Sequence, residues 1–189
     1  MSEAIYGLVS ALGGVFLGAA ATVTTPALSG QYARRQAQRV RDEVAFERMM
    51  ELRRVTRDVL LILDGGRRAM RRSEPVDFLR SLGEAVGKTR EAAARCEKYG
   101  LRFERSRSSA EAIGVRRPPP ESVALRDLVR SALATAFWIG MAVQTTGARQ
   151  RMYEQWADDH YESAENARRR LLGVLWDRMD ELRESMGRS

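Results

Sequence analysis

The sequence is poor in the residue types from which catalytic and metal centres are usually built. Its 189 residues include one cysteine, Cys96, and one histidine, His160. A single cysteine excludes an intramolecular disulfide and a cysteine-based zinc cluster, and its position on an apolar helical stripe predicts a buried structural thiol. The phosphate-loop, His-Glu-x-x-His and Gly-x-Ser-x-Gly motifs are absent from the sequence. The sequence therefore predicts a protein without catalysis, cofactor, metal or small-molecule substrate.

The residues around His160 do not complete a metal site. On a helix, the carboxylates of Glu154, Asp158 and Glu162 share one face near this histidine. Helical di-metal sites need a Glu-x-x-His unit from each of two helices. Position 157 is alanine, and the chain has no second histidine. We interpret the segment as an acidic, solvated helix face.

Lysine is also scarce, although the chain is basic. Of the 32 basic residues only Lys88 and Lys98 are lysines, and the formal net charge is +7. Arginine suits bidentate contacts with phosphate and carboxylate groups, but a GC-rich coding sequence favours it equally. The 30% of charged residues excludes a polytopic membrane protein, and the 44% of hydrophobic residues excludes a wholly disordered chain.

Charge is absent from one long stretch near the start, residues 4–25. These 22 residues read AIYGLVSALGGVFLGAAATVTT. As a helix they would extend about 33 Å, enough to cross a hydrocarbon core of about 30 Å. A helix also satisfies its backbone amides within lipid. Pro26 and Gly30 predict a break at the water interface, so we expect residues 1–30 to form a membrane anchor and its boundary.

Two other interpretations compete with a spanning anchor. A secretory signal peptide begins with basic residues, whereas this chain begins Met1-Ser2-Glu3, although Ala19-Ala20-Ala21 would suit a cleavage site. A buried core helix can be equally apolar but seldom runs 22 residues without a charge. Length and flanks therefore favour the anchor.

The flanks of the apolar run also predict its orientation. Four arginines follow the run before any acidic residue, at Arg34, Arg35, Arg39 and Arg41. Basic residues beside a spanning segment tend to stay in the cytoplasm. We therefore expect a single-pass protein of the cell membrane, with its N-terminus outside and its domain in the cytoplasm. The same arginines are candidates for contact with anionic lipid head groups.

Small residues recur along one face of the predicted anchor. Gly14 and Gly18 form a GxxxG pair, and Gly7 and Ala11 extend nearly the same face. Small residues four apart let two membrane helices approach closely, which predicts packing and homo-oligomers through this face. Chance is the alternative, because glycine is common in membrane helices.

Beyond residue 30 the pattern is helical. Apolar residues three and four apart draw a stripe through residues 31–63, which we expect to end at Asp64-Gly65-Gly66. Ser73 and Pro75 have the character of a helix start, and that second helix should run to Gly100. Residues 31–100 are thus predicted to form a helical hairpin.

The remainder of the chain continues this architecture after a break. Residues 101–120 are rich in Ser, Arg and Pro and predict a loop, with a short helical turn around 110–113. The uncharged run at residues 131–147 is too short to favour a second membrane span, so it predicts a core helix. A long amphipathic helix should follow from residue 148. The fold class is all-α: a transmembrane helix followed by a bundle of three to four helices. Residues 121–189 supply its core helix and its C-terminal helix, and 31–189 form one domain.

A membrane-anchored interaction or scaffold protein without catalysis is the function that these features favour. Its partners would be the lipid bilayer and a protein, either another chain or itself. Long amphipathic helices commonly pair, so Trp156, Leu171, Leu175 and Trp176 are the candidate partner surface; alternatively, this stripe closes the domain's own core. A pore former that oligomerises through the glycine-rich anchor is one alternative function. A membrane-tethered nucleic-acid binder is another, less favoured because acidic residues interleave with the arginines.

Overall fold

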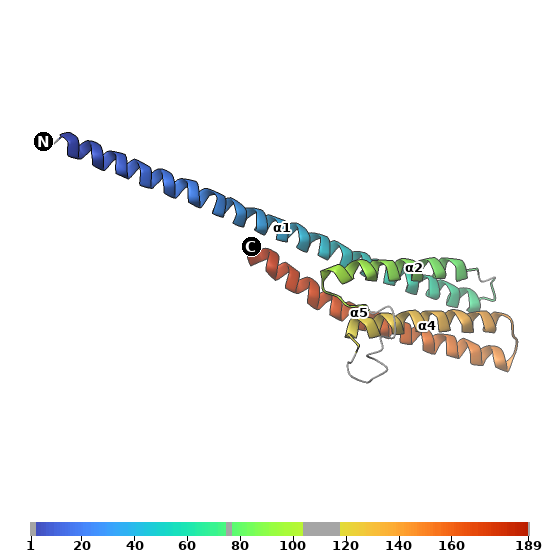
Figure 1. The fold of residues 1–189 in the computed structure, drawn as a ribbon. Coiled ribbons are helices and arrows are strands. Elements are labelled where there is room, and N and C mark those ends of the chain that lie inside the picture. Colours follow the sequence, from blue (N-terminus) through green and yellow to red (C-terminus); the bar gives the residue numbers. More distant parts are fainter. Residues whose placement is uncertain (1–2, 75–76, 104–117, 189) are drawn as a thin grey trace. The chain divides into compact units, whose positions relative to one another are not determined.

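The computed structural model describes residues 3–74, 77–103 and 118–188, and the side chains of residues 3–31 and 188 lie outside this description. Every regular element within the described part is helical. The elements are α1 (Glu3–Arg71), α2 (Leu79–Cys96), the 3-10 turn η1 (Glu97–Tyr99), α4 (Pro120–Val143) and α5 (Ala148–Arg188) (Figure 1). The predicted all-α class is confirmed.

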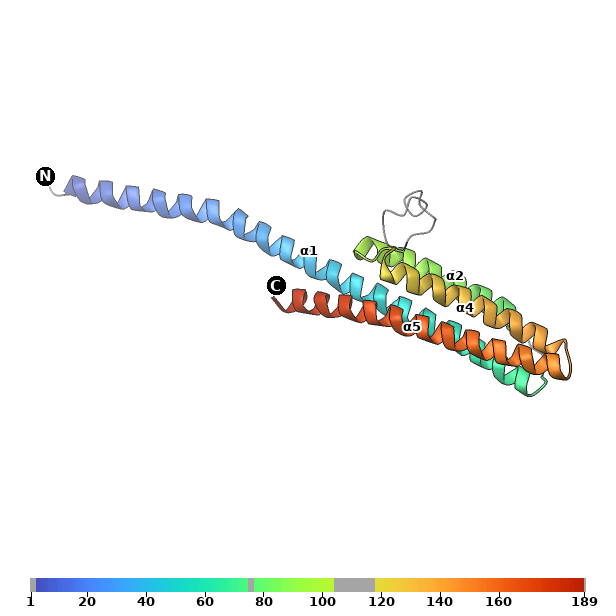
Figure 2. The ribbon, with the colours of Figure 1, turned by 90° about the horizontal axis from the view of Figure 1, so that it is seen from below.

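The chain divides into two compact units. The first contains residues 1–43 and 185–189, and the second contains residues 44–184. The second unit is a four-helix bundle built from the later part of α1, from α2 and α4, and from most of α5. Figures 1 and 2 both show α4 and α5 running side by side within it as an antiparallel hairpin. The predicted bundle of three to four helices is confirmed in this unit.

Different helices contribute apolar side chains of different size to the core of the bundle. The part of α1 in the bundle supplies bulky residues such as Met49, Leu52 and Leu63, which have no exposed surface. The helices α4 and α5 contribute buried alanines to one core cluster: Ala132, Ala136, Ala142, Ala157, Ala164 and Ala167. Small side chains at a contact allow two helix axes to come close. The alanines therefore account for the close pairing of α4 with α5.

The helix α1 does not end at Gly65-Gly66, as the sequence predicted, but continues to Arg71. Gly66 is buried, and a Cβ atom placed there would lie 2.9 Å from the ring of Phe78. The glycine is needed for this close approach and not for a left-handed helix end. Met70, 2% exposed, continues the buried stripe of α1 beyond the glycines.

The start of the second helix also differs from the prediction. Ser73 has a φ of 56° and lies in the turn that follows α1, so it caps no helix. The helix α2 begins only at Leu79, after Phe78, and Pro75 lies outside the described residues. The predicted end at Gly100 is confirmed, since this glycine adopts φ 95° directly after η1. A left-handed residue of this kind is where glycine is favoured.

Two connections flank α4. Residues 104–117, and with them the predicted turn around 110–113, lie outside the described part of the chain. Glu121, in the first turn of α4, is buried and accepts a 2.9 Å hydrogen bond from the backbone N–H of Arg102. After α4 the chain turns through Thr145 to Gly147, which has a φ of 73°. The predicted break between the last two helices is therefore confirmed.

In the first unit, the backbone of α1 is helical from Glu3 and passes through positions 26 and 30, where the sequence predicted a break. A single proline removes one amide donor, and helical residues on both sides can sustain the helix across it. Across the residues with described side chains, no helix is both long enough and apolar enough to span a membrane. The side chains of the predicted anchor, residues 4–25, lie outside that description.

Candidate functional site

The four residues predicted as a partner surface lie in different environments. Leu171 and Leu175 have no exposed surface and belong to a core cluster, so they close the bundle's own core instead of facing a partner. Trp176 is partly buried, and the guanidinium of Arg53 lies 4.8 Å from its ring centroid. Trp156 is 38% exposed. Trp156 is thus the one of these four whose side chain is exposed to solvent.

Trp156 belongs to an aromatic cluster that joins α4 to α5. We use this name for Phe137, Trp138, Tyr153 and Trp156. Trp138 packs edge-on against Trp156, with ring centroids 4.5 Å apart, and stacks on Tyr153 at 5.5 Å. Phe137 meets Trp138 edge-on at 4.8 Å. Offset and edge-to-face pairs of this kind favour a fixed arrangement of the rings. The cluster is therefore a preorganised apolar feature at the bundle surface.

The cluster is only partly covered. Phe137 is 57% exposed and Leu133, one turn earlier on α4, is 49% exposed. Val143 and Met152 are further exposed apolar side chains on the same two helices. Exposed apolar side chains grouped on one face of a bundle mark a site of interaction. Sequence reasoning missed the α4 residues because it placed the whole helix in the core.

A sequence signal for this face does exist. The helix α4 carries two apolar stripes, one of alanines such as Ala132 and Ala136 and one of the bulky residues Leu133 and Phe137. The alanine stripe is buried, and the bulky stripe faces outward. Periodicity alone cannot say which stripe meets the core, because both repeat at helical spacing.

An open groove between α4 and α5 adjoins the aromatic cluster. Its cavity volume is about 660 Å³, and its lining includes Arg130 and Ala134 from α4 and His160 from α5. Arg130 and Ala134 precede Phe137 by two turns and one turn, and His160 follows Trp156 by one turn, so the groove continues the same helix faces. Arg130 is exposed and makes no ion pair or hydrogen bond with another described residue. The surface thus combines an apolar end with a basic side chain.

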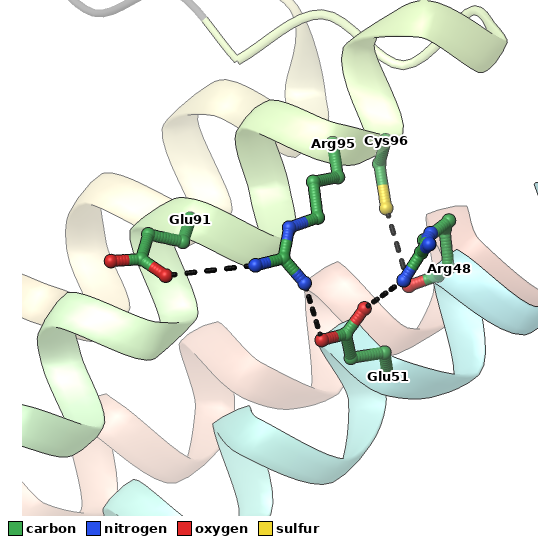
Figure 3. A network of polar contacts seen from close by, with 5 residues as sticks. All are labelled: Arg48, Glu51, Glu91, Arg95 and Cys96. Atoms are coloured by element: carbon green, nitrogen blue, oxygen red, sulfur yellow. Dashed lines mark hydrogen bonds and ion pairs between the residues drawn. The ribbon is translucent and has the colours of Figure 1, made fainter.

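A second set of polar contacts lies between α1 and α2, and Figure 3 shows it in close-up. The Arg95 guanidinium reaches from α2 to the Glu51 carboxylate on α1 at 2.9 Å, and Arg48 binds the other oxygen of that carboxylate at 3.1 Å. The Cys96 thiol donates to the Arg48 backbone carbonyl over 3.4 Å. Cys96 has no exposed surface. These contacts join two helices, and they leave no route for a substrate to the sulfur.

Burial determines the chemistry of this thiol. It raises the pKa of Cys96 to about 12, and the Glu51 carboxylate adds to the rise, whereas Arg48 opposes it. A nucleophilic cysteine needs a lowered pKa and an accessible sulfur. Within the described residues, no three or more His, Cys, Asp or Glu side chains are grouped to hold a metal ion. His160 and the carboxylates near it in the sequence therefore form no such group in the structure.

Many arginines on the α1 and α5 faces are paired with acids. Asp158 of α5 accepts a hydrogen bond from the Arg67 Nε at 2.7 Å and one from Arg71 at 2.8 Å. Arg67 also lies 4.1 Å from the ring centroid of Tyr161. Arg170 pairs with Asp127 at 3.0 Å, across α5 and α4. Several of the arginines that could have met nucleic-acid phosphates therefore serve the fold.

The predicted lipid contacts lie in the first unit. Arg34, Arg35, Arg39 and Arg41 are all exposed along α1. Near them Asp42 is only 4% exposed and accepts hydrogen bonds from Gln38 at 2.8 Å and Ser185 at 3.0 Å. The predicted packing face of the anchor, Gly7, Ala11, Gly14 and Gly18, lies outside the residues with described side chains.

The chain was compared with known proteins at three levels. A scan against protein-family models and searches of the curated proteins and the solved structures found no match.

Proposed function

We propose that this protein is a membrane-anchored interaction protein whose helical bundle binds a protein partner through the aromatic cluster and the adjoining Leu133. The single observation that carries the proposal is the outward-facing apolar surface that Phe137, Trp156 and Leu133 form across α4 and α5. Exposed aromatic side chains at the centre of a surface are the usual anchors of protein interfaces. Binding would cover area that otherwise faces water.

The chemistry of the surface indicates the kind of partner. Two parallel rows of apolar side chains, one on each helix of a hairpin, suit an amphipathic helix lying along them. The Arg130 guanidinium at one end, which binds no other side chain within the described residues, favours a carboxylate on that helix. We therefore propose that the partner presents an apolar helix face flanked by an acidic residue. A second copy of this chain is the competing occupant.

The membrane anchor belongs to the same proposal. It is supported by the 22-residue uncharged run at residues 4–25 and by the four exposed arginines that follow it. With the domain on the basic side of the anchor, the bundle would hold its partner at the cytoplasmic face of the cell membrane.

Site-specific cross-linking tests the partner surface. A photo-reactive amino acid at position 133 of the full chain should give one discrete adduct, whereas the same group at the exposed position 162 should give none. The adduct mass distinguishes a different protein from a second copy, and peptide mapping of a different protein should find an acidic amphipathic helix. Adducts of equal yield at positions 133 and 162 would contradict the proposal. A cross-linked partner peptide that has no apolar helix face would also contradict it.

A matched pair of substitutions makes the test quantitative. Phe137→Asp should weaken binding of the identified partner by at least about thirtyfold, since loss of a central aromatic anchor costs about 2 kcal/mol or more. Leu61→Asp, at a 53% exposed position on α1, should leave the affinity nearly unchanged. Leu61→Asp should leave the unfolding midpoint nearly unchanged, and Phe137→Asp should lower it only slightly, since its ring is 57% exposed and loses one edge-on contact with Trp138.

A further inference from the structure

Residues 32–41 of α1, in the first unit, form a helical stretch with solvent on every side. Every residue of this stretch is exposed, although its backbone is helical throughout. Tyr32 is 70% exposed and Val40 is 55% exposed. Helices in proteins gain most of their stability by packing an apolar face against a neighbour. A helix that keeps such side chains in water therefore has a face that another molecule can cover.

One apolar row runs along this stretch. We use the name stalk seam for Ala33, Ala37 and Val40, which are spaced by four and then three residues. The same alternation runs back toward the N-terminus through Gly30, Pro26, Val23, Ala19, Phe16 and Leu12. It gives an average period of about 3.5 residues, which is typical of helices that pair in a left-handed coiled coil.

The C-terminal helix of the same chain contacts the opposite side of α1. Asp42 is 4% exposed and accepts a 3.0 Å hydrogen bond from Ser185, near the end of α5. Asp42 follows Val40 by two residues, which corresponds to about 200° around a helix. The face of α1 that meets α5 here therefore points away from the stalk seam, and the seam stays exposed.

The residues beside the stalk seam indicate the direction of a second helix. Arg34 and Arg41 lie along one edge of the seam, and Gln36 and Glu43 lie along the other. Antiparallel pairing of two copies would bring the two arginine edges together, and their like charges would repel. Parallel pairing instead places the arginine edge of each copy against the Gln36 and Glu43 edge of the other. The charges are therefore complementary in a parallel pair of identical helices.

We propose that a second copy of this chain covers the stalk seam, with the two α1 helices parallel and in register. This inference rests on the membrane anchor of the proposed function, which would give two copies in one bilayer the same direction and depth. A helix of a soluble protein would match the seam only outside the bilayer, whereas a second copy also matches it through residues 12–30. Anchoring raises the effective concentration of one stalk seam near another, which offsets the small area that two alanines and a valine bury.

Disulfide scanning of the full-length chain in its membrane tests the stalk seam. Under mild oxidation, Ala33→Cys, Ala37→Cys and Val40→Cys should each give a disulfide-linked dimer in high yield. Arg35→Cys, on the outer side of the helix, is the matched control and should give little. The wild-type chain supplies the background, because its one cysteine, Cys96, is buried. Equal yields at all four positions, or no dimer at any of them, would overturn the proposal.

Pairing through the glycine pair of the predicted anchor is the competing arrangement. Gln36 follows Gly18 by eighteen residues, which is about five full turns, so the two share one face of the helix. A dimer yield that is highest in Gln36→Cys would therefore overturn the stalk seam and favour the glycine face. A disulfide to a different protein would show that another partner covers the seam, and it would also overturn the proposal.

A charge placed in the seam separates specific pairing from random encounters in the membrane. In the Ala33→Cys chain, Val40→Asp should lower the dimer yield about tenfold, because two carboxylates would meet in an apolar seam. Arg35→Asp is the matched control and should leave the yield nearly unchanged. An undiminished yield with Val40→Asp would overturn the seam.

Retention of the same samples in the membrane pellet separates this inference from the anchor. A chain that stays in the pellet without forming the dimer contradicts the dimer alone. A chain that is released into the supernatant contradicts both the anchor and the dimer.

Discussion

At the scale of the residue, Cys96 illustrates how position decides chemistry. Its side chain is fully buried between α2 and α1, and its only hydrogen bond among the described residues runs to the Arg48 carbonyl. Burial, and then the Glu51 carboxylate, raise the thiol pKa from 9.0 to about 12. The sequence predicted a buried structural thiol from the helical stripe, and that prediction is confirmed. It could not predict the pKa, because the carboxylate and the guanidinium come from another helix.

Alkylation of Cys96 should therefore be slow in the folded chain. At about pH 8 a thiol of pKa 12 is ionised about a thousandfold less than one of pKa 9.0, and the sulfur is also inaccessible. The rate should rise with pH in both states, and it should level off near pH 9 in the unfolded state but only near pH 12 in the folded state. Mass spectrometry after timed exposure to iodoacetamide, with and without concentrated urea, measures both rates. Equal rates in the two conditions would show an accessible thiol.

At the scale of the element, α1 shows how tertiary contact overrides a local stop signal. A glycine pair after an apolar stripe commonly ends a helix, yet α1 continues through Gly65 and Gly66 to Arg71. Leu63 and Met70 are buried on either side of the pair, so the helix gains core contacts by continuing. The ring of Phe78 fills the space that a side chain at Gly66 would need. The two glycines thus have different roles.

Alanine substitution should separate these roles. Gly65→Ala should raise the free energy of unfolding by about 1 kcal/mol, because a Cβ there meets nothing within 4 Å and alanine favours the helix. Gly66→Ala should gain less or lose stability, since its Cβ would lie 2.9 Å from the Phe78 ring. Urea unfolding followed by circular dichroism measures both. Equal gains would mean that Phe78 moves aside without cost.

At the scale of the whole molecule, the bundle is observed and the membrane anchor is proposed. The bundle follows from described helices and their buried faces. The proposed membrane anchor rests on the uncharged run at residues 4–25 and on the arginines after it. The tests of the anchor are therefore biochemical, and they measure whether the chain stays with the membrane or is released into solution.

Full-length protein should remain in the membrane pellet after alkaline carbonate extraction, and a chain lacking residues 1–30 should be released. Val15→Arg should also release it, since an arginine at the centre of a spanning helix costs about 2.5–3.5 kcal/mol. Tyr32→Arg, beyond the apolar run, is the matched control and should stay in the pellet. Full-length protein recovered wholly in the supernatant would contradict the anchor.

The amino-acid sequence by itself determined the features that depend on near neighbours. Helical periodicity predicted the all-α class and the long C-terminal helix, and glycine predicted the ends at Gly100 and near Gly147. Tertiary structure alone decided which stripe of α4 met the core, and so exposed Phe137. It also decided which arginines found acids, such as Arg67 and Arg71, which share Asp158. The physical reason is the same in both cases. Burial and ion pairing depend on which residues distant in the chain come together, and the spacing of residues along one helix does not indicate those contacts.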